Sequence, residues 1–468
     1  MTTPCLAEPA GLRPGRRTPW RAELRATLAL AAPLVLTNLA QLGLTASNTV
    51  LLGRLGAEPL AAGALATGLF TLLLIGGIGL TSAVLPLVAE AAGGDGDAAG
   101  IRRTVRAGFW AAALFTAPLM PVLWQAEPIL LRLGQDPAVA RDAGAYLRVL
   151  QWWMAPALLF MVLRGFLSAL QRPAWPMAVS FAALPVNLGL GLFLAFGPPQ
   201  LGIVGVGLAT TLTECGSFAA LALVVSLDPQ LARYRLFAGL WRPDRARLRH
   251  LLGLGLPMAA TGLAEAGLFE SAAIMVGVFG ATQLAAHAVT IQIAACCFMV
   301  PNGVGQAASV RVGRALGAGD RAALRRAGAV ALALGLAFMA LCALAQVTIP
   351  ERLIGLFLDA DAPGAAAVLP VAVSFLAISA VFAMADGTQT VALGALRGLQ
   401  DTRVPMLIAL AGYWGVGVPA GALLAWGAGF EGRGIWMGFC AGLLVVSVLL
   451  VARWRRLSRS EAGLRADA

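Results

Sequence analysis

Long apolar runs separated by short polar breaks dominate the chain, and their length determines which element they predict. A helix needs about 20 residues to cross the hydrocarbon layer of a bilayer. Twelve runs meet this length, so we predict an all-α polytopic membrane protein with twelve transmembrane helices. The expected spans are 27–53, 60–91, 105–125, 142–170, 175–197, 201–227, 251–280, 284–314, 324–348, 366–396, 404–427 and 433–453.

The second half of this pattern repeats the first. At one constant offset, Pro33, Gly43, Gly53 and Gly56 recur as Pro257, Gly267, Gly277 and Gly280. Farther along, the stretch GFLSALQRPAWPM at 165–177 matches GALRGLQDTRVPM at 394–406. We therefore predict two pseudo-symmetric six-helix lobes that enter the membrane from the same side. Transporters built from such parallel repeats bind their substrate between the repeats.

Composition supports the membrane assignment and excludes a water-soluble protein. Hydrophobic residues form 59% of the chain and charged residues only 12%, with a mean hydropathy of +0.81, so a soluble surface could not be built. The 55 glycines suit closely packed membrane helices. The six cysteines are scattered and predict packing rather than a disulfide framework or a metal centre.

The basic residues indicate how the chain is oriented. The net charge is +11, and the arginines gather in every second loop. Cytoplasmic loops carry such an excess, so we expect both termini in the cytoplasm of a bacterium, with the chain in its plasma (inner) membrane and no nucleic-acid partner. The expected parts are an N-terminal tail (1–26), a first lobe (27–227), a basic linker (228–250), a second lobe (251–453) and a C-terminal tail (454–468).

Two carboxylates lie inside apolar runs of the second lobe. Glu265 lies within span 251–280 and Asp386 within span 366–396. A charged side chain at the centre of a membrane helix costs about 2.5–3.5 kcal/mol on insertion scales, so a functional role is expected. Burial disfavours the charged form of a carboxylate, and such a pair could take up a proton or hold Na⁺. Their polar neighbours at helical spacing are Thr261, Gln389 and Thr390.

The alternative for each acid is a purely structural pairing with a buried arginine. The arginines of the spans lie toward the span ends, and Arg164, the most interior, is near the end of its span. We therefore expect no salt bridge at mid-depth.

The first span carries a polar but uncharged face. Thr37, Gln41, Thr45 and Asn48 follow at spacings of four, four and three, which places them on one side of a helix. Gln41 is the repeat partner of Glu265. This face predicts either part of a substrate cavity between the lobes or interhelical hydrogen bonds that hold the bundle together.

Further polar residues in the spans allow the same two interpretations. Asn302 and Gln306 could line the cavity or serve packing, and Glu214 is the deep acid of the first lobe. His287 lies near a helix end, where a structural role is expected first. The remaining candidates are Asn187 and Gln292.

At this point the sequence resembles the multidrug and toxic compound extrusion (MATE) family, and within it the NorM-like branch. The resemblance covers roughly residues 25–455. It is carried by QLGLTASNTVLLG at 41–53, GLAEAGLF at 262–269, LAAHAVTIQIA at 284–294, SVRVGRALGAGD at 309–320 and ADGTQTVALGALRGLQDTRVPM at 385–406.

The resemblance implies an antiporter that expels lipophilic, often cationic, organic compounds in exchange for H⁺ or Na⁺. Such an antiporter would need no cofactor other than the coupling ion. The family's cation site of the second lobe falls on Glu265 and Asp386, which would be metal ligands only with Na⁺ as the coupling ion. Family members usually carry aspartate where this chain has Asn48. Since asparagine cannot be protonated, coupling through the first lobe is in doubt. His287 and Asn187 also match family motifs.

Other classes of function remain to be weighed. A flippase for a lipid-linked precursor on a related scaffold is the main alternative, and it would favour a basic cavity for a pyrophosphate head. No HExxH, GxSxG or GxxxxGK motif is present, so the sequence does not predict an enzyme. The expected partners are small organic cations and the lipid bilayer, with the chain acting as a monomer. H⁺ and Na⁺ remain equal alternatives.

Overall fold

The expected membrane helices are present in the structure, a computed structural model that describes residues 20–359 and 364–460. Within these residues the chain is helical, and twelve helices are long and apolar enough to span a bilayer, as predicted. The first helix begins at Trp20 and the last ends at Arg459, so both extend into segments expected as tails. The rest of the two expected tails, 1–19 and 461–468, lies outside the described residues.

The helices of the first lobe are α1 (Trp20–Leu55), α2 (Ala57–Thr81), α3 (Val84–Gly93), α4 (Ala98–Trp124), α5 (Ala126–Arg132), α6 (Pro137–Ala169), α7 (Ala174–Phe196) and α8 (Gly202–Leu227). The short helix α9 (Pro229–Ala232) lies in the linker. The second lobe contains α10 (Arg245–Gly277), α11 (Ala281–Gly317), α12 (Arg321–Thr348), α13 (Pro350–Ile354), α14 (Ala365–Gly398), α15 (Arg403–Leu410), the π-helix η1 (Ala411–Gly417), α16 (Val418–Ala422), the π-helix η2 (Leu423–Gly427) and α17 (Glu431–Arg459).

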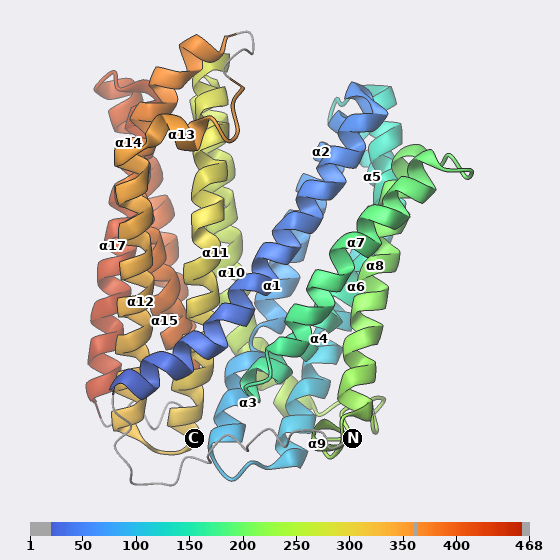
Figure 1. The fold of residues 1–468 in the computed structure, drawn as a ribbon, viewed down its shortest axis with the longest axis vertical. Coiled ribbons are helices and arrows are strands. Elements are labelled where there is room, and N and C mark those ends of the chain that lie inside the picture. Colours follow the sequence, from blue (N-terminus) through green and yellow to red (C-terminus); the bar gives the residue numbers. More distant parts are fainter. Residues whose placement is uncertain (1–19, 360–363, 461–468) are drawn as a thin grey trace, which may run out of the picture.

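The two groups of helices meet at one end of the molecule and diverge toward the other (Figure 1). We call the end where they meet the closed end. Helix α14 is central in the second lobe, where it packs against α11, α12 and α17. Helix α1 contacts both lobes, because it packs against α11 and α12 as well as α7. Both the linker and the contacts of this helix therefore connect the two lobes.

Glycines allow the lobes to approach at the closed end. A Cβ atom placed on Gly317 of α11 would lie 2.0 Å from the carbonyl oxygen of Glu90 on α3. A Cβ atom on Gly93 of α3 would lie 2.0 Å from the carbonyl oxygen of Arg314 on α11. Small residues let helix backbones approach this closely. The contact between α3 and α11 therefore requires a glycine on each helix.

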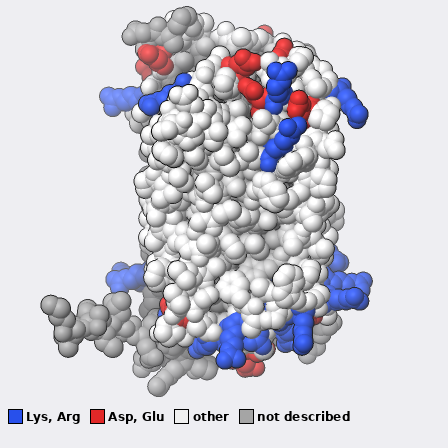
Figure 2. Space-filling view, turned by 90° about the vertical axis from the view of Figure 1, so that its right-hand side faces the viewer, with Lys and Arg blue, Asp and Glu red and all other residues white. Residues whose placement is uncertain are grey.

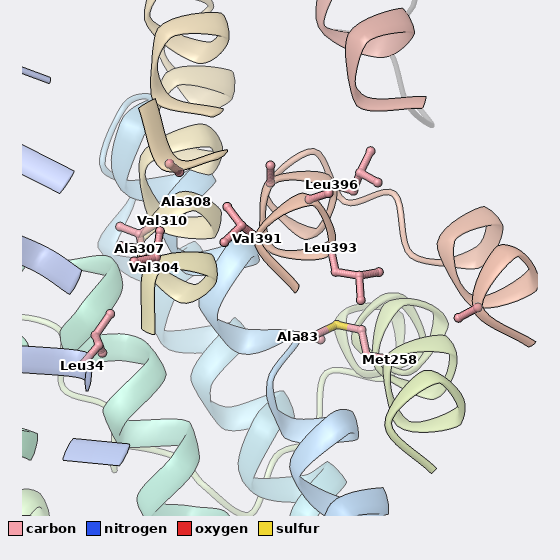
Figure 3. Close-up of a cluster of buried hydrophobic side chains, with 14 of the residues drawn as sticks. Leu34, Ala83, Met258, Val304, Ala307, Ala308, Val310, Val391, Leu393 and Leu396 are labelled. Carbon is pink, nitrogen blue, oxygen red and sulfur yellow. The ribbon is translucent and has the colours of Figure 1, made fainter. Parts of the chain in front are cut away.

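A buried apolar cluster crosses the boundary between the lobes. Figure 3 shows Leu34, Met258, Val304 and Val391 in this cluster, and they come from α1, α10, α11 and α14. Ala83, between α2 and α3, belongs to it as well. A second cluster lies within the first lobe alone. Apolar packing therefore holds the two lobes together where their helices meet.

On the face shown in Figure 2, the charged side chains gather at the two ends of the molecule. A broad band without charged residues separates them. Such a band matches the hydrocarbon layer of a bilayer, where exposed charge is costly. The distribution agrees with a protein that spans the membrane several times.

One ion pair fastens the start of α1 to the second lobe. Glu23 is 1% exposed, and its two carboxylate oxygens accept hydrogen bonds from Nε and Nη2 of Arg311 at 2.8 and 2.6 Å. Removing one partner of a buried pair leaves the other charge uncompensated, which costs about 3–5 kcal/mol. We expect Glu23→Gln to lower the unfolding temperature by several degrees in detergent. The exposed Glu58→Gln is the control, and equal unfolding temperatures for both variants would contradict this prediction.

Candidate functional site

The structure brings the two carboxylates of the second lobe to one place. Asp386 lies on α14 and is 4% exposed, and Glu265 lies partly buried on α10. Gln389, one turn after Asp386, joins them. Its Nε2 atom donates hydrogen bonds to Asp386 Oδ1 at 3.1 Å and to Glu265 Oε1 at 3.3 Å. A single amide thus bridges two acids from different helices, and it comes from one of the polar neighbours that the sequence indicated.

A buried tyrosine fixes the orientation of this amide. The hydroxyl of Tyr413 donates a hydrogen bond to Gln389 Oε1 at 2.8 Å, which turns Nε2 toward the carboxylates. Tyr413 lies on η1, and π-helical turns often occur at functional sites. The neighbouring Trp414 donates through Nε1 to the carbonyl of Ala264 at 3.2 Å, so η1 is fastened beside Glu265. The sequence analysis missed Tyr413. A lone tyrosine in an apolar span could have identified it as a candidate, because a buried hydroxyl needs a hydrogen-bond partner.

An arginine at the end of α14 lies near Glu265, in keeping with the expectation that the arginines of the spans lie toward the span ends. The charge of Arg397, on α14, is close enough to Glu265 for the two to interact. Among the described residues, Arg397 makes no ion pair within 4.0 Å, so neither acid is held in a direct salt bridge. Arg397 is the next-to-last residue of α14, so its charge reaches Glu265 from the end of the helix.

A second arginine lies between the lobes. Arg164 of α6 is 5% exposed, and its guanidinium donates to Asn38 Oδ1 at 2.6 Å and to Gln306 Oε1 at 2.9 Å. It also reaches Gln41 Oε1 at 3.4 Å. Arg164 is near the end of α6, as expected, but its side chain contacts the middle of α1. The crossing of α6 and α1, which the sequence does not reveal, brings a side chain near the end of one helix to the middle of the other.

These residues line a polar cavity between the lobes, which we call the interlobe cavity. Its volume is about 250 Å³. Residues from α1, α6, α11 and α14 contribute to it, including Arg164 and Arg397. The predicted candidates in its lining are Gln41, Asn302, Gln306 and Thr390. Asn302 Oδ1 accepts a hydrogen bond from Gln306 Nε2 at 3.2 Å, so Gln306 is held from two sides.

A smaller cavity of about 170 Å³ lies inside the first lobe, next to the interlobe cavity. Gln41 lines both, and Thr45, Asn48 and Glu214 line the smaller one. Asn48 donates to Thr210 Oγ1 at 3.0 Å and accepts from Nδ2 of Asn187 at 2.8 Å. Both ends of the Asn48 amide are therefore used in hydrogen bonds between helices. The predicted interhelical hydrogen bonds of the polar face are therefore present at Asn48, and the same face also lines a cavity.

Other candidates lie away from the cavities. Thr37 and Thr261 donate to the carbonyls of Pro33 and Pro257, at 2.7 and 2.9 Å, so their hydroxyls are bonded within their own helices. The repeat thus preserves this proline–threonine contact in both lobes. Gln292 is exposed and does not join Gln306 in the interlobe cavity.

His287 is 4% exposed, with its ring 5.6 Å from that of Trp436. Its surroundings agree with the structural role expected first.

The chain has counterparts among known proteins. The profile of the MatE family matches residues 33–193 and 257–423, one segment in each lobe. A "Probable multidrug resistance protein NorM" of Mesorhizobium japonicum is 48% identical over 452 residues, covering 95% of this chain and 97% of the relative. A protein of the same name from Brucella suis is 47% identical over 441 residues, covering 93% and 94%.

Solved structures agree with the fold. The eukaryotic MATE transporter AtDTX14 superposes with a TM-score of 0.85 at 22% identity, covering 94% of this chain and 98% of that one. An outward-facing multidrug resistance MATE family transporter of the MOP superfamily also gives 0.85, at 18% identity, covering 95% and 97%. The profile and the relatives extend over both lobes, and the resemblance seen in the sequence is confirmed. The chain therefore belongs to the MatE family, the multidrug and toxic compound extrusion transporters, and is not an enzyme.

Proposed function

We propose that the protein exports lipophilic, cationic organic compounds in exchange for H⁺ or Na⁺. Its relatives are named multidrug resistance proteins, and the exporting role is carried over from them. The observation that carries the coupling is the bridge from Gln389 to Glu265 and Asp386. Two acids in a poorly solvated place change their interactions strongly when a cation neutralises them. This site couples an ion to the conformation of the second lobe.

Coupling follows from the hydrogen bonds of the bridge. With both acids charged, the Gln389 amide and the nearby Arg397 offset their repulsion. A proton or Na⁺ bound to the acids reduces the repulsion between them. The hydrogen bonds from the Gln389 amide then stabilise this arrangement less, so the contacts among α10, α14 and η1 change. A ligand shifts a conformational equilibrium only by its different affinity for the two states. Cation and substrate therefore favour opposite arrangements of the lobes.

We place both termini and the closed end in the cytoplasm. This proposal is supported by the arginines of the linker and of the end of α17, because positive charge is enriched on the cytoplasmic side. The lobes diverge toward the opposite side, so the arrangement in Figure 1 corresponds to an outward-facing state. We further propose that the protein works as a monomer in the bacterial inner membrane.

The proposed exchange is tested in proteoliposomes with a fluorescent organic cation. A proton gradient and a sodium gradient are imposed separately, and dye movement is followed under each. We expect one of the two gradients to drive transport against the dye gradient. Membrane potential contributes about 2.3 kcal/mol per charge per 100 mV, so it is clamped in both experiments. Movement of no cation under either gradient would contradict the proposal.

A flippase for a lipid-linked precursor is the second candidate, and one observation favours it. Arg164 and Arg397 line the interlobe cavity, where arginines could bind a phosphate head. The variants Arg164→Gln and Arg397→Gln separate the two functions. Loss of lipid translocation in both variants, with no cation transport by the wild-type protein, would support the flippase. Cation transport by the wild-type protein without translocation of lipid would support the exporter.

The role of the amide bridge gives a milder prediction. We expect Tyr413→Phe to lower gradient-driven transport about tenfold, because the lost hydroxyl no longer fixes the orientation of the Gln389 amide. A buried group left without its hydrogen bond costs about 1–3 kcal/mol. Initial rates in proteoliposomes measure the effect. Tyr234→Phe is the matched control, since that tyrosine is also buried but lies in the linker, and this variant should transport at the wild-type rate.

A further inference from the structure

An apolar groove lies on the flank of the first lobe, separate from the transport cavities. It has a volume of about 800 Å³ and runs between α4 and α8, with side chains of the linker at one end. Its lining includes Trp110, Phe218, Leu223 and Trp241, and no charged residue belongs to it. None of its lining residues lines the interlobe cavity. Leu223 is 58% exposed, so the groove opens sideways to the surroundings of the lobe.

The linker is fastened over this groove by defined contacts. Trp110 Nε1 donates to the carbonyl of Leu240 at 2.9 Å, and Arg106 Nη2 donates to the carbonyl of Arg242 at 2.5 Å. Phe237 stacks on Phe109 with ring centroids 5.9 Å apart. The groove is therefore a built feature of the linker and α4. Trp241, 89% exposed, stands at its rim.

Positive charge collects in the linker segment at the rim, since Arg235 is two residues before the lining residue Phe237 and Arg242 follows the lining residue Trp241. Arg233, Arg235 and Arg242 are exposed in the linker, and within the described chain none of them forms an ion pair. The two acids of the linker already have other partners. Asp228 pairs with Arg172 at 2.8 Å, and Asp244 caps the first turn of α10. The rim thus carries positive charge that the chain itself does not neutralise.

We propose that an anionic phospholipid binds at this place, with an acyl chain in the groove and its phosphate at Arg235 and Arg242. An apolar groove beside an unpaired basic rim suits an amphiphile with an anionic head. Arginine binds phosphate through charge-assisted hydrogen bonds, and basic pockets at the cytoplasmic end of membrane helices bind anionic lipid heads. The inference depends on the proposed orientation, which puts the linker at the cytoplasmic leaflet. It concerns a bound lipid and not the exported compound.

The test is native mass spectrometry of the full chain in mild detergent, titrated with phosphatidylglycerol and with phosphatidylcholine of the same acyl chains. We expect phosphatidylglycerol to bind more tightly than phosphatidylcholine. The double variant Arg235→Gln/Arg242→Gln should weaken phosphatidylglycerol binding about 30-fold, because each basic residue near a membrane surface contributes about fivefold. Phosphatidylcholine binding should not change.

Two further variants test the location. Arg455→Gln/Arg456→Gln removes two exposed charges from the end of α17 in the other lobe and should leave phosphatidylglycerol affinity unchanged. Ala222→Trp fills the groove and should weaken both lipids. The proposal is overturned if Arg235→Gln/Arg242→Gln binds phosphatidylglycerol as tightly as wild type. It is also overturned if the two double variants weaken phosphatidylglycerol binding equally. Gradient-driven dye transport, measured in parallel, reports on the proposed function separately, because these variants leave the carboxylate site intact.

Discussion

Glu265→Gln and Asp386→Asn should each reduce gradient-driven export to the background of protein-free liposomes, while expression and folding persist. Each substitution removes an ionisable group but keeps its shape. The Gln389 amide would then face a neutral partner, so binding of the coupling cation would no longer change the contacts of α10 and α14. Both variants are expected to fold at least as stably as wild type, since a buried charge is removed.

The measurement is initial dye transport in proteoliposomes, with protein content matched. Glu270→Gln is the control, because Glu270 is an exposed acid on the same helix as Glu265. That variant should transport at the wild-type rate. Transport at the wild-type rate by either Glu265→Gln or Asp386→Asn would remove the basis for the proposed coupling. Equal losses in all three variants would indicate a general effect of charge on the helix.

Gly317→Val should also abolish export, for a steric reason. The added Cβ would lie 2.0 Å from the carbonyl oxygen of Glu90, a distance that real Cβ atoms do not adopt against backbone. Helices α3 and α11 would therefore have to separate, and the closed end could not form. We expect the protein to remain open at the proposed cytoplasmic end, with export reduced to background.

Accessibility of a buried position reports the opening directly. Ser168 is 1% exposed and lines the interlobe cavity, so Ser168→Cys in a cysteine-free background should react slowly with a soluble thiol reagent. Adding Gly317→Val should raise that rate at least tenfold. Gly253→Val is the matched control, because a Cβ at Gly253 has no neighbour within 4 Å. Unchanged labelling and normal export in the Gly317 variant would contradict a tight closed end.

Much of the fold followed from local pattern. The apolar runs predicted twelve spans because the bilayer imposes one length on every helix that crosses it. The repeated prolines and glycines predicted two lobes, since a duplicated sequence folds twice in the same way. Sequence also singled out Glu265 and Asp386, because a carboxylate inside an apolar run stands out without any knowledge of its partners.

The contacts of the site could not be predicted in this way. Gln389 and Glu265 are 124 residues apart, and Arg164 and Gln306 are 142 apart. Whether such side chains meet depends on how each helix is rotated and where two helices cross. Arg164 illustrates this point, because its position near the end of α6 suggested a place away from the middle of the bundle. The crossing of α1 and α6 brings it to the interlobe cavity instead.

By itself, the sequence determined the membrane class, the number of spans, the duplication and the two acids, because each is a property of one segment or of two similar segments. Only the tertiary structure decided that Gln389 bridges those acids, that Tyr413 fixes the amide, and that two arginines line the space between the lobes. Hydrogen bonds and electrostatic contacts act over a few ångströms, so they are set by the packing of distant segments and not by their order along the chain.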